Sequence, residues 1–223
     1  RWDGRDLGPV SPVEFIPVAE ETGLIEDIGE WVLKTACVEA VDWHAAGITP
    51  VQLSVNLSAR QFMQRDLPDR VARIIGEAGL EPELLDLELT ESMVAEGGDA
   101  TLSILRSLKD MNLSLSIDDF GTGYSSLSRL TRMPIDVVKV DRSFVTNLPD
   151  DSGAVTMAKA IVSMAMNLNL EIVAEGVETE MQKGFLNGLG CKVGQGYLFS
   201  KPVPAGEFRR MLLGGDGRIH PTA

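Results

Sequence analysis

Polar and apolar residues alternate strictly along three short segments of this chain. The segments that show this period of two are 51–57, 85–90 and 113–118. Such alternation is typical of β-strands that have one polar and one apolar face. Three further apolar segments lie at 135–141, 170–175 and about 191–197. The pattern therefore predicts six strands.

Amphipathic stretches between these segments predict helices. They cover residues 67–78, 100–111, 154–167 and 179–189, with a shorter one at 125–132. Before the first strand, the pattern predicts a long helix over 27–46, and Ser-Pro-Val-Glu at 11–14 is typical of a capping box with proline in the first turn. The large apolar side chains of the helical stretches are predicted to pack in the core: Phe15, Trp31, Met164, Met166 and Phe185.

Alternating strands and helices predict parallel pairing with right-handed crossovers, which is α/β architecture. Parallel strands buried on both faces usually read as continuous apolar runs, yet three of these strands carry one polar face. A (β/α) barrel accounts for both features, because apolar side chains then face the helices and polar side chains line the interior. An antiparallel sheet with one wet face is the alternative, which the intervening helices disfavour.

Length and charge narrow the class of protein. The 223 residues are 44% apolar, enough for one sizeable core, and we expect a domain over 1–213 followed by a flexible tail at 214–223. A net charge of −13 argues against a surface that binds long nucleic acid, although divalent cations in an acidic cleft can attract phosphate. Two cysteines without metal-ligand spacing, and no long apolar run, favour a cytoplasmic location, with a membrane tether elsewhere in a longer protein left open.

The predicted strands end in polar residues, and the carboxyl ends of the strands are where (β/α) barrels build active sites. These residues are Asn56, Glu88, Asp118, Lys139, Glu175 and Gln195. Asp118 is followed by a second carboxylate, Asp119, and two neighbouring like charges need a counter-charge. The oxygen atoms of Asn56, Glu88 and Asp118 suit Mg²⁺ or Mn²⁺ rather than zinc.

Strand alternation points Asp119 away from Asp118, from where it could reach a second ion. Two ions about 3.5–4 Å apart can clamp a phosphate and activate water. The alternative is that the Asp-Asp pair forms a turn or a helix cap. Gly121 and Gly123 follow the pair, and they allow the backbone to turn sharply close to the site.

Four further residues are candidates for the site. Lys139 could orient a water or neutralise a phosphoryl oxygen, or it could form a structural ion pair. Glu175 is a candidate metal ligand or general base. Glu178 by itself is more typical of a helix cap, and Gln195, which stands between two glycines, can reach a ligand.

Taken together, these motifs resemble the EAL-domain phosphodiesterases, which hydrolyse the bacterial second messenger cyclic di-GMP to linear pGpG. They occur in the order RW, VSPVEFIPVAEETGLI, VNLSARQF, LELTES, DDFGTGYSSL, IDVVKVDRSFV, VAEGVET and QGYLFSKP. The resemblance implies a TIM-like barrel that depends on two Mg²⁺ or Mn²⁺ ions and is inhibited by Ca²⁺. It also implies a homodimer through the DDFGTG loop region, and a sensory or GGDEF-type domain that precedes this one in the full-length protein.

The resemblance assigns roles by motif. It implies that Asn56, Glu88 and Asp118 bind metal and that Asp119 holds the second ion. Lys139 and Glu175 would position or deprotonate the attacking water. The remaining residues would brace the DDFGTG loop or contact the dinucleotide: Glu91 for the loop, Arg1 and Pro202 for the dinucleotide, and Glu178 and Gln195 to complete the site.

One departure from the family pattern concerns its name. In the family, a Glu-Ala-Leu tripeptide stands just before the Arg-Trp pair, and its glutamate binds metal. This sequence begins at Arg1 and does not contain the tripeptide. We interpret this as a truncated N-terminus that also lacks the first strands. Two other functions stay open: a receptor that binds cyclic di-GMP without hydrolysis, and a Mg²⁺-dependent lyase or enolising barrel that uses Lys139 as base.

Overall fold

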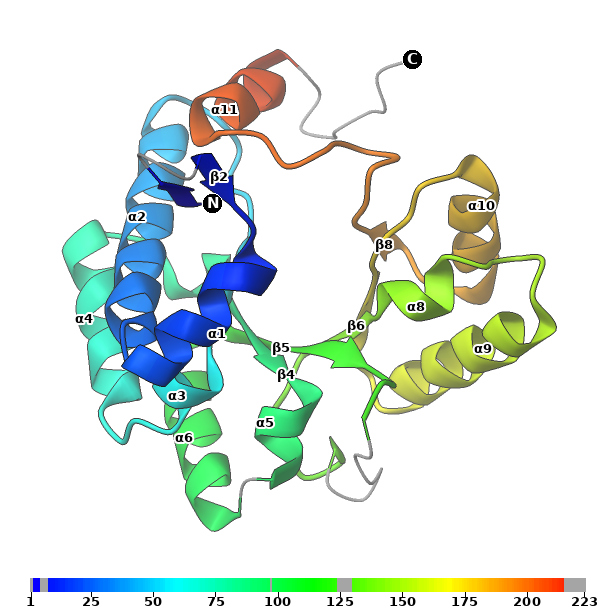
Figure 1. Ribbon diagram of the computed structural model, residues 1–223, viewed down its shortest axis with the longest axis horizontal. Helices are drawn as coiled ribbons and strands as arrows, with labels where there is room; N and C mark the ends of the chain where they lie inside the picture. The colour runs from blue at the N-terminus through cyan, green and yellow to red at the C-terminus, as the bar shows by residue number, and fades with distance from the viewer. Residues whose placement is uncertain (1, 5–7, 97, 124–129, 215–223) are drawn as a thin grey trace.

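A parallel sheet of six strands forms the centre of the molecule in a computed structural model that describes residues 2–4, 8–96, 98–123 and 130–214 (Figure 1). Along the sheet the strands are β3 (Leu53–Asn56), β4 (Leu85–Thr90), β5 (Ser114–Phe120), β6 (Val137–Val140), β7 (Glu171–Ala174) and β8 (Val193–Gly194). Every neighbouring pair is parallel. The six predicted strands and their direction are thus confirmed. Among the described residues β3 and β8 are the two edges, so the sheet is a half-barrel.

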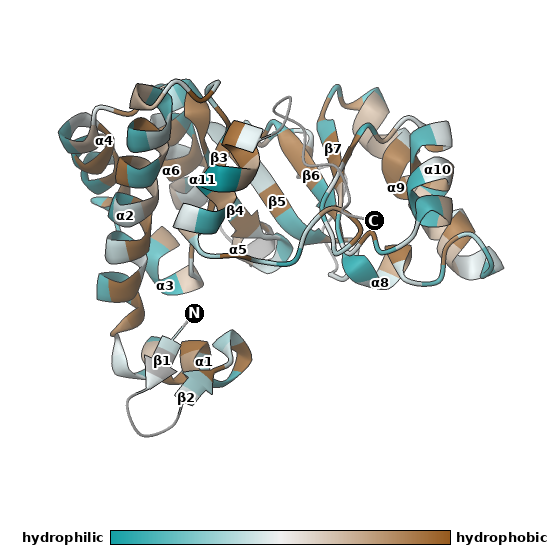
Figure 2. Ribbon diagram, turned by 90° about the horizontal axis from the view of Figure 1, so that it is seen from above, coloured by the Kyte–Doolittle hydropathy of each residue, from teal (hydrophilic) through white to brown (hydrophobic). Residues whose placement is uncertain are grey.

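Helices precede the sheet, join its strands and flank it. Their bounds are α1 (Pro12–Thr22), α2 (Ile25–Ala45), α3 (Ala59–Phe62), α4 (Leu67–Ala78), α5 (Glu91–Glu96), α6 (Asp99–Lys109), α8 (Arg142–Val145), α9 (Ser152–Asn167), α10 (Glu180–Leu189) and α11 (Ala205–Gly214). A short 3-10 helix covers Pro82–Leu84. Figure 2 shows α2, α4 and α6 at one end of the sheet and α9 and α10 at the other. The five long helices that alternation predicted are present, whereas most of the predicted helix at 125–132 lies outside the described residues.

The N-terminal region departs from the prediction. The strands β1 (Trp2–Gly4) and β2 (Gly8–Val10) form an antiparallel hairpin that stands apart from the sheet, together with α1 (Figure 2). Ser11 precedes α1 and Pro12 is its first residue, as expected, but the Ser11 side chain makes no capping hydrogen bond. The predicted capping box is therefore wrong there. Capping boxes occur instead at Ser58 and Thr179.

The core lies between the sheet and its helices. Most apolar residues of the alternating segments are buried, and several are fully buried: Leu85, Leu87, Leu89, Leu115 and Ile117. This outcome confirms the predicted apolar face. Phe15, Met164 and Phe185 are partly buried, but Trp31 is 66% exposed and Met166 55% exposed, so their placement in the core was wrong. Helical spacing alone does not reveal which side of a helix meets the sheet.

The chain returns to α2 at its C-terminal end. In α11, Leu212 and Phe208 pack with Trp43 of α2 and with Ile48, and the rings of Trp43 and Phe208 lie 5.3 Å apart. Gly214, where the predicted tail begins, is the last residue of α11, and residues 215–223 lie outside the described part. No helix of the described residues is long and apolar enough to span a membrane.

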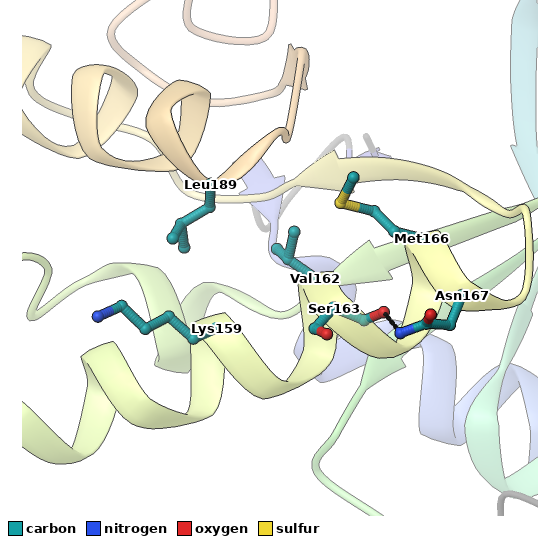
Figure 3. A pocket seen from close by; sticks show the side chains of 6 residues that line it. All are labelled: Lys159, Val162, Ser163, Met166, Asn167 and Leu189. Atoms are coloured by element: carbon teal, nitrogen blue, oxygen red, sulfur yellow. Dashed lines mark hydrogen bonds between the residues drawn. The ribbon is translucent and has the colours of Figure 1, made fainter.

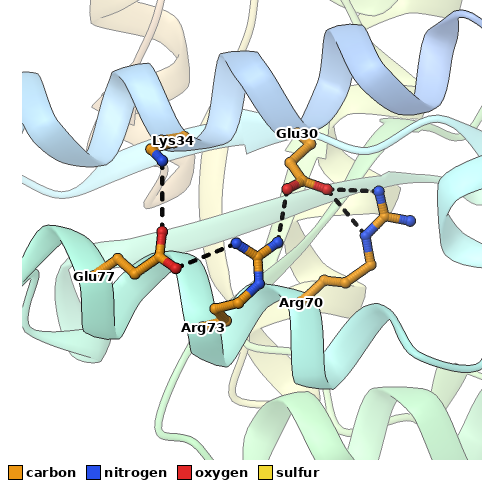
Figure 4. A network of polar contacts seen from close by, with 5 residues as sticks. All are labelled: Glu30, Lys34, Arg70, Arg73 and Glu77. Carbon is orange, nitrogen blue, oxygen red and sulfur yellow. Dashed lines mark hydrogen bonds and ion pairs between the residues drawn. The ribbon is translucent and has the colours of Figure 1, made fainter.

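An ion-pair network joins α2 to α4 (Figure 4). The Glu30 carboxylate accepts hydrogen bonds from Nε and Nη2 of Arg70 at 3.1 and 2.6 Å, and from Nη2 of Arg73 at 2.7 Å. Lys34 and Arg73 also contact Glu77, at 3.5 and 3.4 Å. The hydrogen bonds from Arg70 and then Arg73 lower the pKa of Glu30.

Replacing Glu30 with glutamine is expected to lower the free energy of unfolding by about 1 kcal/mol at pH 7, because partly exposed ion pairs contribute little more than this. The pKa of Glu30 is lower in the folded state, so the contribution is present above the ordinary carboxyl pKa and is lost as the pH falls through the lowered value. Urea denaturation at pH 7 and at pH 3, with Asp27→Asn on the exposed side of α2 as control, measures this. Equal losses in both variants would contradict it.

Candidate functional site

Polar side chains gather at the carboxyl end of the sheet. Asn56 is the last residue of β3, Glu88 lies in β4, Asp118 in β5 and Lys139 in β6, and Glu175 directly follows β7. Parallel neighbours bring these ends to one edge of the half-barrel. The structure thus places five residues from successive strands at the same end, as the strand pattern predicted.

Lys139 is the centre of this group. Its Nζ lies 2.8 Å from Oε1 of Glu88 and 2.6 Å from Oε1 of Glu175. Oδ1 of Asp118 is 3.3 Å away. Asn56 joins the group through Glu88, because its Nδ2 donates a hydrogen bond of 2.6 Å to Oε2 of that residue. One ammonium group therefore links carboxylates from three different strands, and Lys139 is only 5% exposed.

A β-bulge sets the position of the two aspartates. Ile117 pairs with Val138 and Phe120 with Val140, so β5 has one residue more than β6 over this stretch. Asp119 has a φ of 54°, a left-handed conformation that aspartate tolerates better than most residues. The carboxylates of Asp118 and Asp119 lie with that of Glu175 such that one oxygen of each is within 4.8 Å of the others. Here we call these three residues the acidic triad.

The predicted orientation of Asp119 is therefore wrong. Strict alternation would point its side chain away from Asp118, but the extra residue of the bulge resets the alternation and brings both carboxylates to one side. This orientation determines which carboxylates can bind the same cation. Three carboxylates lie close enough to share one cation, whereas Glu88 and Asn56 reach this triad through Lys139.

Burial raises the pKa of several groups in the site. It raises the pKa of Glu88 and of Glu175, and Lys139 offsets only part of this effect. Burial also raises the pKa of Asp119, and the neighbouring charge of Asp118 adds to the shift. Desolvation lowers the pKa of Lys139, but the charges of Glu88 and Glu175 outweigh it and hold that pKa above its usual value. Lys139 is thus a fixed cation.

The donor set fits a hard divalent cation. Every candidate ligand is a carboxylate or amide, and oxygen ligands are those that Mg²⁺ and Mn²⁺ prefer. Three carboxylates contact the ammonium group of Lys139, and the carboxylate of Asp119 lies beside two of them, so carboxyl groups outnumber the positive charge at the site. Asn56 offers its amide nitrogen to Glu88 in this arrangement, and its amide oxygen is the atom that a cation would take.

Glu91 holds the turn after the two aspartates. It is the first residue of α5, it is 4% exposed, and its Oε2 accepts hydrogen bonds from the backbone N–H groups of Gly121 and Gly123 at 2.9 and 3.2 Å. A Cβ atom at Gly123 would lie 3.0 Å from the Glu91 carboxyl group, and Gly121 has a φ of 98°. Glycine at these positions lets the turn approach Glu91 closely.

Replacing Glu91 with glutamine is expected to reduce any turnover about 10- to 100-fold, because the neutral amide holds the two N–H groups less firmly and the aspartates lose their fixed position. Metal-dependent hydrolysis, compared with that of Glu83→Gln, an exposed acid ahead of β4, measures this effect. Unchanged turnover in Glu91→Gln would contradict a bracing role.

The structure describes three of the four proposed substrate residues. Glu178 forms an ion pair of 2.8 Å with Arg142. The side chain of Gln195 is exposed, and its backbone N–H donates to the carbonyl of Ala174. Pro202 is exposed in the segment before α11, and Arg1 lies outside the described residues.

Asp86 is a further residue of this region that was not among the candidates from the sequence. It lies two residues before Glu88 and is 3% exposed, and its carboxylate accepts hydrogen bonds from Ser116 at 2.6 Å and from Ser54 at 3.0 Å. The signal was available, since the alternation of 85–90 places Asp86 on the same face as Glu88. Arg142, the partner of Glu178, had no comparable signal.

A surface groove between α9 and α10 is no competitor for this site (Figure 3). It is lined by Lys159, Val162, Ser163, Met166, Asn167 and Leu189. None of these residues is a carboxylate, and none belongs to the group around Lys139.

Comparison with known proteins decides the family. The family model described as the EAL domain matches residues 1–202. The chain belongs to the EAL domain family. The predicted resemblance and the TIM-like fold are thereby confirmed.

Several EAL proteins are close relatives. The chain is 47% identical over 205 residues to the bifunctional diguanylate cyclase/cyclic di-GMP phosphodiesterase MucR of Pseudomonas aeruginosa, a match that covers 92% of this chain and 30% of MucR. It is 43% identical to the oxygen sensor protein DosP of Escherichia coli, over 93% of this chain and 26% of DosP. The chain thus spans less than a third of these proteins.

Solved EAL structures share the fold. The structure titled PaMucR phosphodiesterase, c-di-GMP complex, matches with a TM-score of 0.90 at 47% identity, covering 93% of this chain and 84% of that one. The EAL domain of Mycobacterium smegmatis DcpA matches with a TM-score of 0.83 at 39% identity, over 87% of this chain and 86% of that one.

Proposed function

We propose that this EAL domain hydrolyses cyclic di-GMP to linear pGpG. The observation that carries the proposal is the group of carboxylates around Lys139 at the carboxyl end of the sheet. Membership of the EAL family supports the substrate, because relatives bear the name cyclic di-GMP phosphodiesterase and the PaMucR structure is titled as a c-di-GMP complex. Phosphodiester hydrolysis near neutral pH also suits an acidic site that binds divalent cations.

The site would hold two ions, Mg²⁺ or Mn²⁺. Asn56, Glu88 and Asp118 would hold the first, and the acidic triad would hold the second, with Asp118 shared between them. Such ions, when bound, polarise a phosphoryl oxygen and acidify water. Ca²⁺ is expected to inhibit, because it is larger and takes more ligands in looser geometry.

The residues of the chain would divide the remaining work. Glu175 is a proton acceptor for the attacking water, since burial raises its pKa toward the operating pH and makes it a better base than an ordinary carboxylate. Lys139 holds Glu88, Asp118 and Glu175 in place and donates hydrogen bonds to them. Its raised pKa keeps it protonated, which disfavours the alternative in which Lys139 is the base of an enolising enzyme.

Substrate contacts would come from the rim of the site. Glu178 and Gln195 follow β7 and β8 at the carboxyl end of the sheet, and both are accessible to a dinucleotide. Arg142 fixes Glu178 through their ion pair. Pro202 and Arg1 are proposed to contact the dinucleotide on the strength of the family motifs alone.

Metal affinity is expected to fall as the pH is lowered. The pKa values of Glu88, Asp119 and Glu175 are raised, so protons compete with the cation above the ordinary carboxyl pKa of about 4.3. These groups stabilise the metal-free fold below that ordinary value, and the contribution is lost as the pH rises through the raised values. Mn²⁺ titrations from pH 5 to 8 test the trend in affinity, and thermal melts of the metal-free protein test the trend in stability. An affinity that did not change with pH would contradict the first trend.

The direct test is hydrolysis of cyclic di-GMP by the full-length protein with Mg²⁺, followed as pGpG by chromatography. Product that forms with Mg²⁺ and disappears with Ca²⁺ supports the proposal. Tight binding without product would make the domain a receptor. If the protein showed neither binding nor product, cyclic di-GMP would be overturned as the ligand.

The length of the relatives supports a longer, multidomain protein. MucR and DosP are more than three times as long as the matched region, and their names describe a cyclase and an oxygen sensor. We propose that the full-length protein likewise joins this domain to a sensory or GGDEF-type domain, and that the domain forms a homodimer through the DDFGTG loop region at 118–123. Light scattering of the purified protein gives the oligomeric state.

A further inference from the structure

Asp86 is a buried acid that forms no ion pair with a basic residue in the part of the chain that the structure describes. It lies in β4, one layer deeper in the half-barrel than Glu88, and is 3% exposed. Its partners are the hydroxyl groups of Ser54 and Ser116, from the two neighbouring strands. Among the described residues no lysine, arginine or histidine forms an ion pair with Asp86.

Hydroxyl groups alone are a weak compensation for a buried carboxylate. They satisfy its hydrogen bonds, but they supply no opposite charge, and burial of an uncompensated charge is strongly unfavourable. A neutral residue could be buried between the two serines without that cost. A carboxylate at this position therefore indicates that a positive charge offsets it in the working protein.

Glu88 connects Asp86 to the proposed metal site. Both side chains point to the same face of β4, and two residues along a strand correspond to about 6.6 Å. The charge of Asp86 is one of the effects that raise the pKa of Glu88. A cation held by Glu88 would feel the same charge as an attraction.

We propose that Asp86 is a positioning residue that places a fixed negative charge beneath Glu88 and strengthens the binding of divalent cations at the neighbouring ligands. The inference rests on the proposed two-ion site. Bound cations supply the counter-charge that Asp86 lacks, while Ser54 and Ser116 hold its carboxylate in place. At a separation of about 7 Å or more, one unit of charge in a partly solvated site should change the affinity on the order of 10-fold.

Asp86→Asn is the decisive variant, because it keeps the shape and an acceptor for the serine hydroxyls but removes the charge. Calorimetric titration with Mn²⁺ at pH 7.5 should show affinity about 10-fold weaker than in the parent protein. The metal-free melting temperature should be unchanged or higher, because a buried charge is gone. Asp110→Asn, exposed at the end of α6, removes the same charge elsewhere and should leave the affinity unchanged.

Ser116→Ala separates the charge from a structural role. It removes one hydroxyl group but keeps the carboxylate, so the affinity for Mn²⁺ should fall less than in Asp86→Asn. Parent-like Mn²⁺ affinity in Asp86→Asn, with a lowered melting temperature, would overturn the proposal and make Asp86 a tie between strands.

The outcomes also separate this inference from the proposed function. Parent protein that binds Mn²⁺ but does not hydrolyse cyclic di-GMP would contradict the function and leave the role of Asp86 standing. No Mn²⁺ binding by the parent would overturn the two-ion site together with the role of Asp86.

Discussion

Lys139→Met is expected to destabilise the metal-free domain by about 3–5 kcal/mol and to abolish hydrolysis. Lys139 is 5% exposed and its ammonium group contacts Glu88, Asp118 and Glu175. Removal of one partner from a buried ion pair leaves the other charges uncompensated, and losses of this size are typical. Urea denaturation of the metal-free protein measures the effect.

Divalent cations should partly reverse this loss. Mn²⁺ can neutralise the same carboxylates, so it should raise the melting temperature of Lys139→Met more than that of the parent protein. Lys159→Met, an exposed lysine of α9, removes one positive charge without touching the site and serves as the control. A loss below about 1 kcal/mol in Lys139→Met, or no additional effect of Mn²⁺, would contradict Lys139 as the counter-charge of the site.

The alternation of the strands made most of the site predictable. In segments such as 85–90, every second residue faces the interior, and parallel strands bring their carboxyl ends together. This reasoning placed Glu88, Lys139 and Glu175 at one end of a sheet from the sequence alone. Their contacts with one another follow from that placement and from their opposite charges.

The orientation of the Asp119 side chain could not be predicted from the alternation. Its orientation depends on a bulge, and a bulge depends on how β5 pairs with β6, which no local pattern of apolar residues specifies. Trp31 is a related case, since its helical period fits a core residue but the side chain lies exposed on α2. Asp86 differs from both, because the alternation of 85–90 puts it on the same face as Glu88 although it was not singled out from the sequence. Only the structure shows that its partners are hydroxyl groups.

Glu175→Gln is expected to lower turnover by more than 100-fold without loss of stability. The side chain is a member of the acidic triad and contacts Lys139 at 2.6 Å, and even residues outside the first ligand layer of metal sites commonly contribute about 10- to 100-fold. Asp118→Asn should have a comparable effect on turnover, because Asp118 is shared by both proposed ions.

Stability should follow the opposite trend from turnover. Burial raises the pKa of Glu175, so at pH 7 the folded state holds an ionised carboxylate less favourably than the unfolded chain does, and a neutral amide removes that penalty. The metal-free melting temperature of Glu175→Gln should therefore equal or exceed that of the parent. Glu171→Gln, at the exposed start of the same strand, is the matched control and should retain turnover.

Turnover and metal-free stability of Glu175→Gln distinguish its possible roles only when both are measured. Retained turnover in Glu175→Gln would exclude this residue as ligand and as base. Turnover lost together with the fold would make Glu175 a structural partner of Lys139. Turnover lost at undiminished stability is expected only if the carboxylates around Lys139 are kept in an unfavourable, charged arrangement because the chemistry of the site needs them.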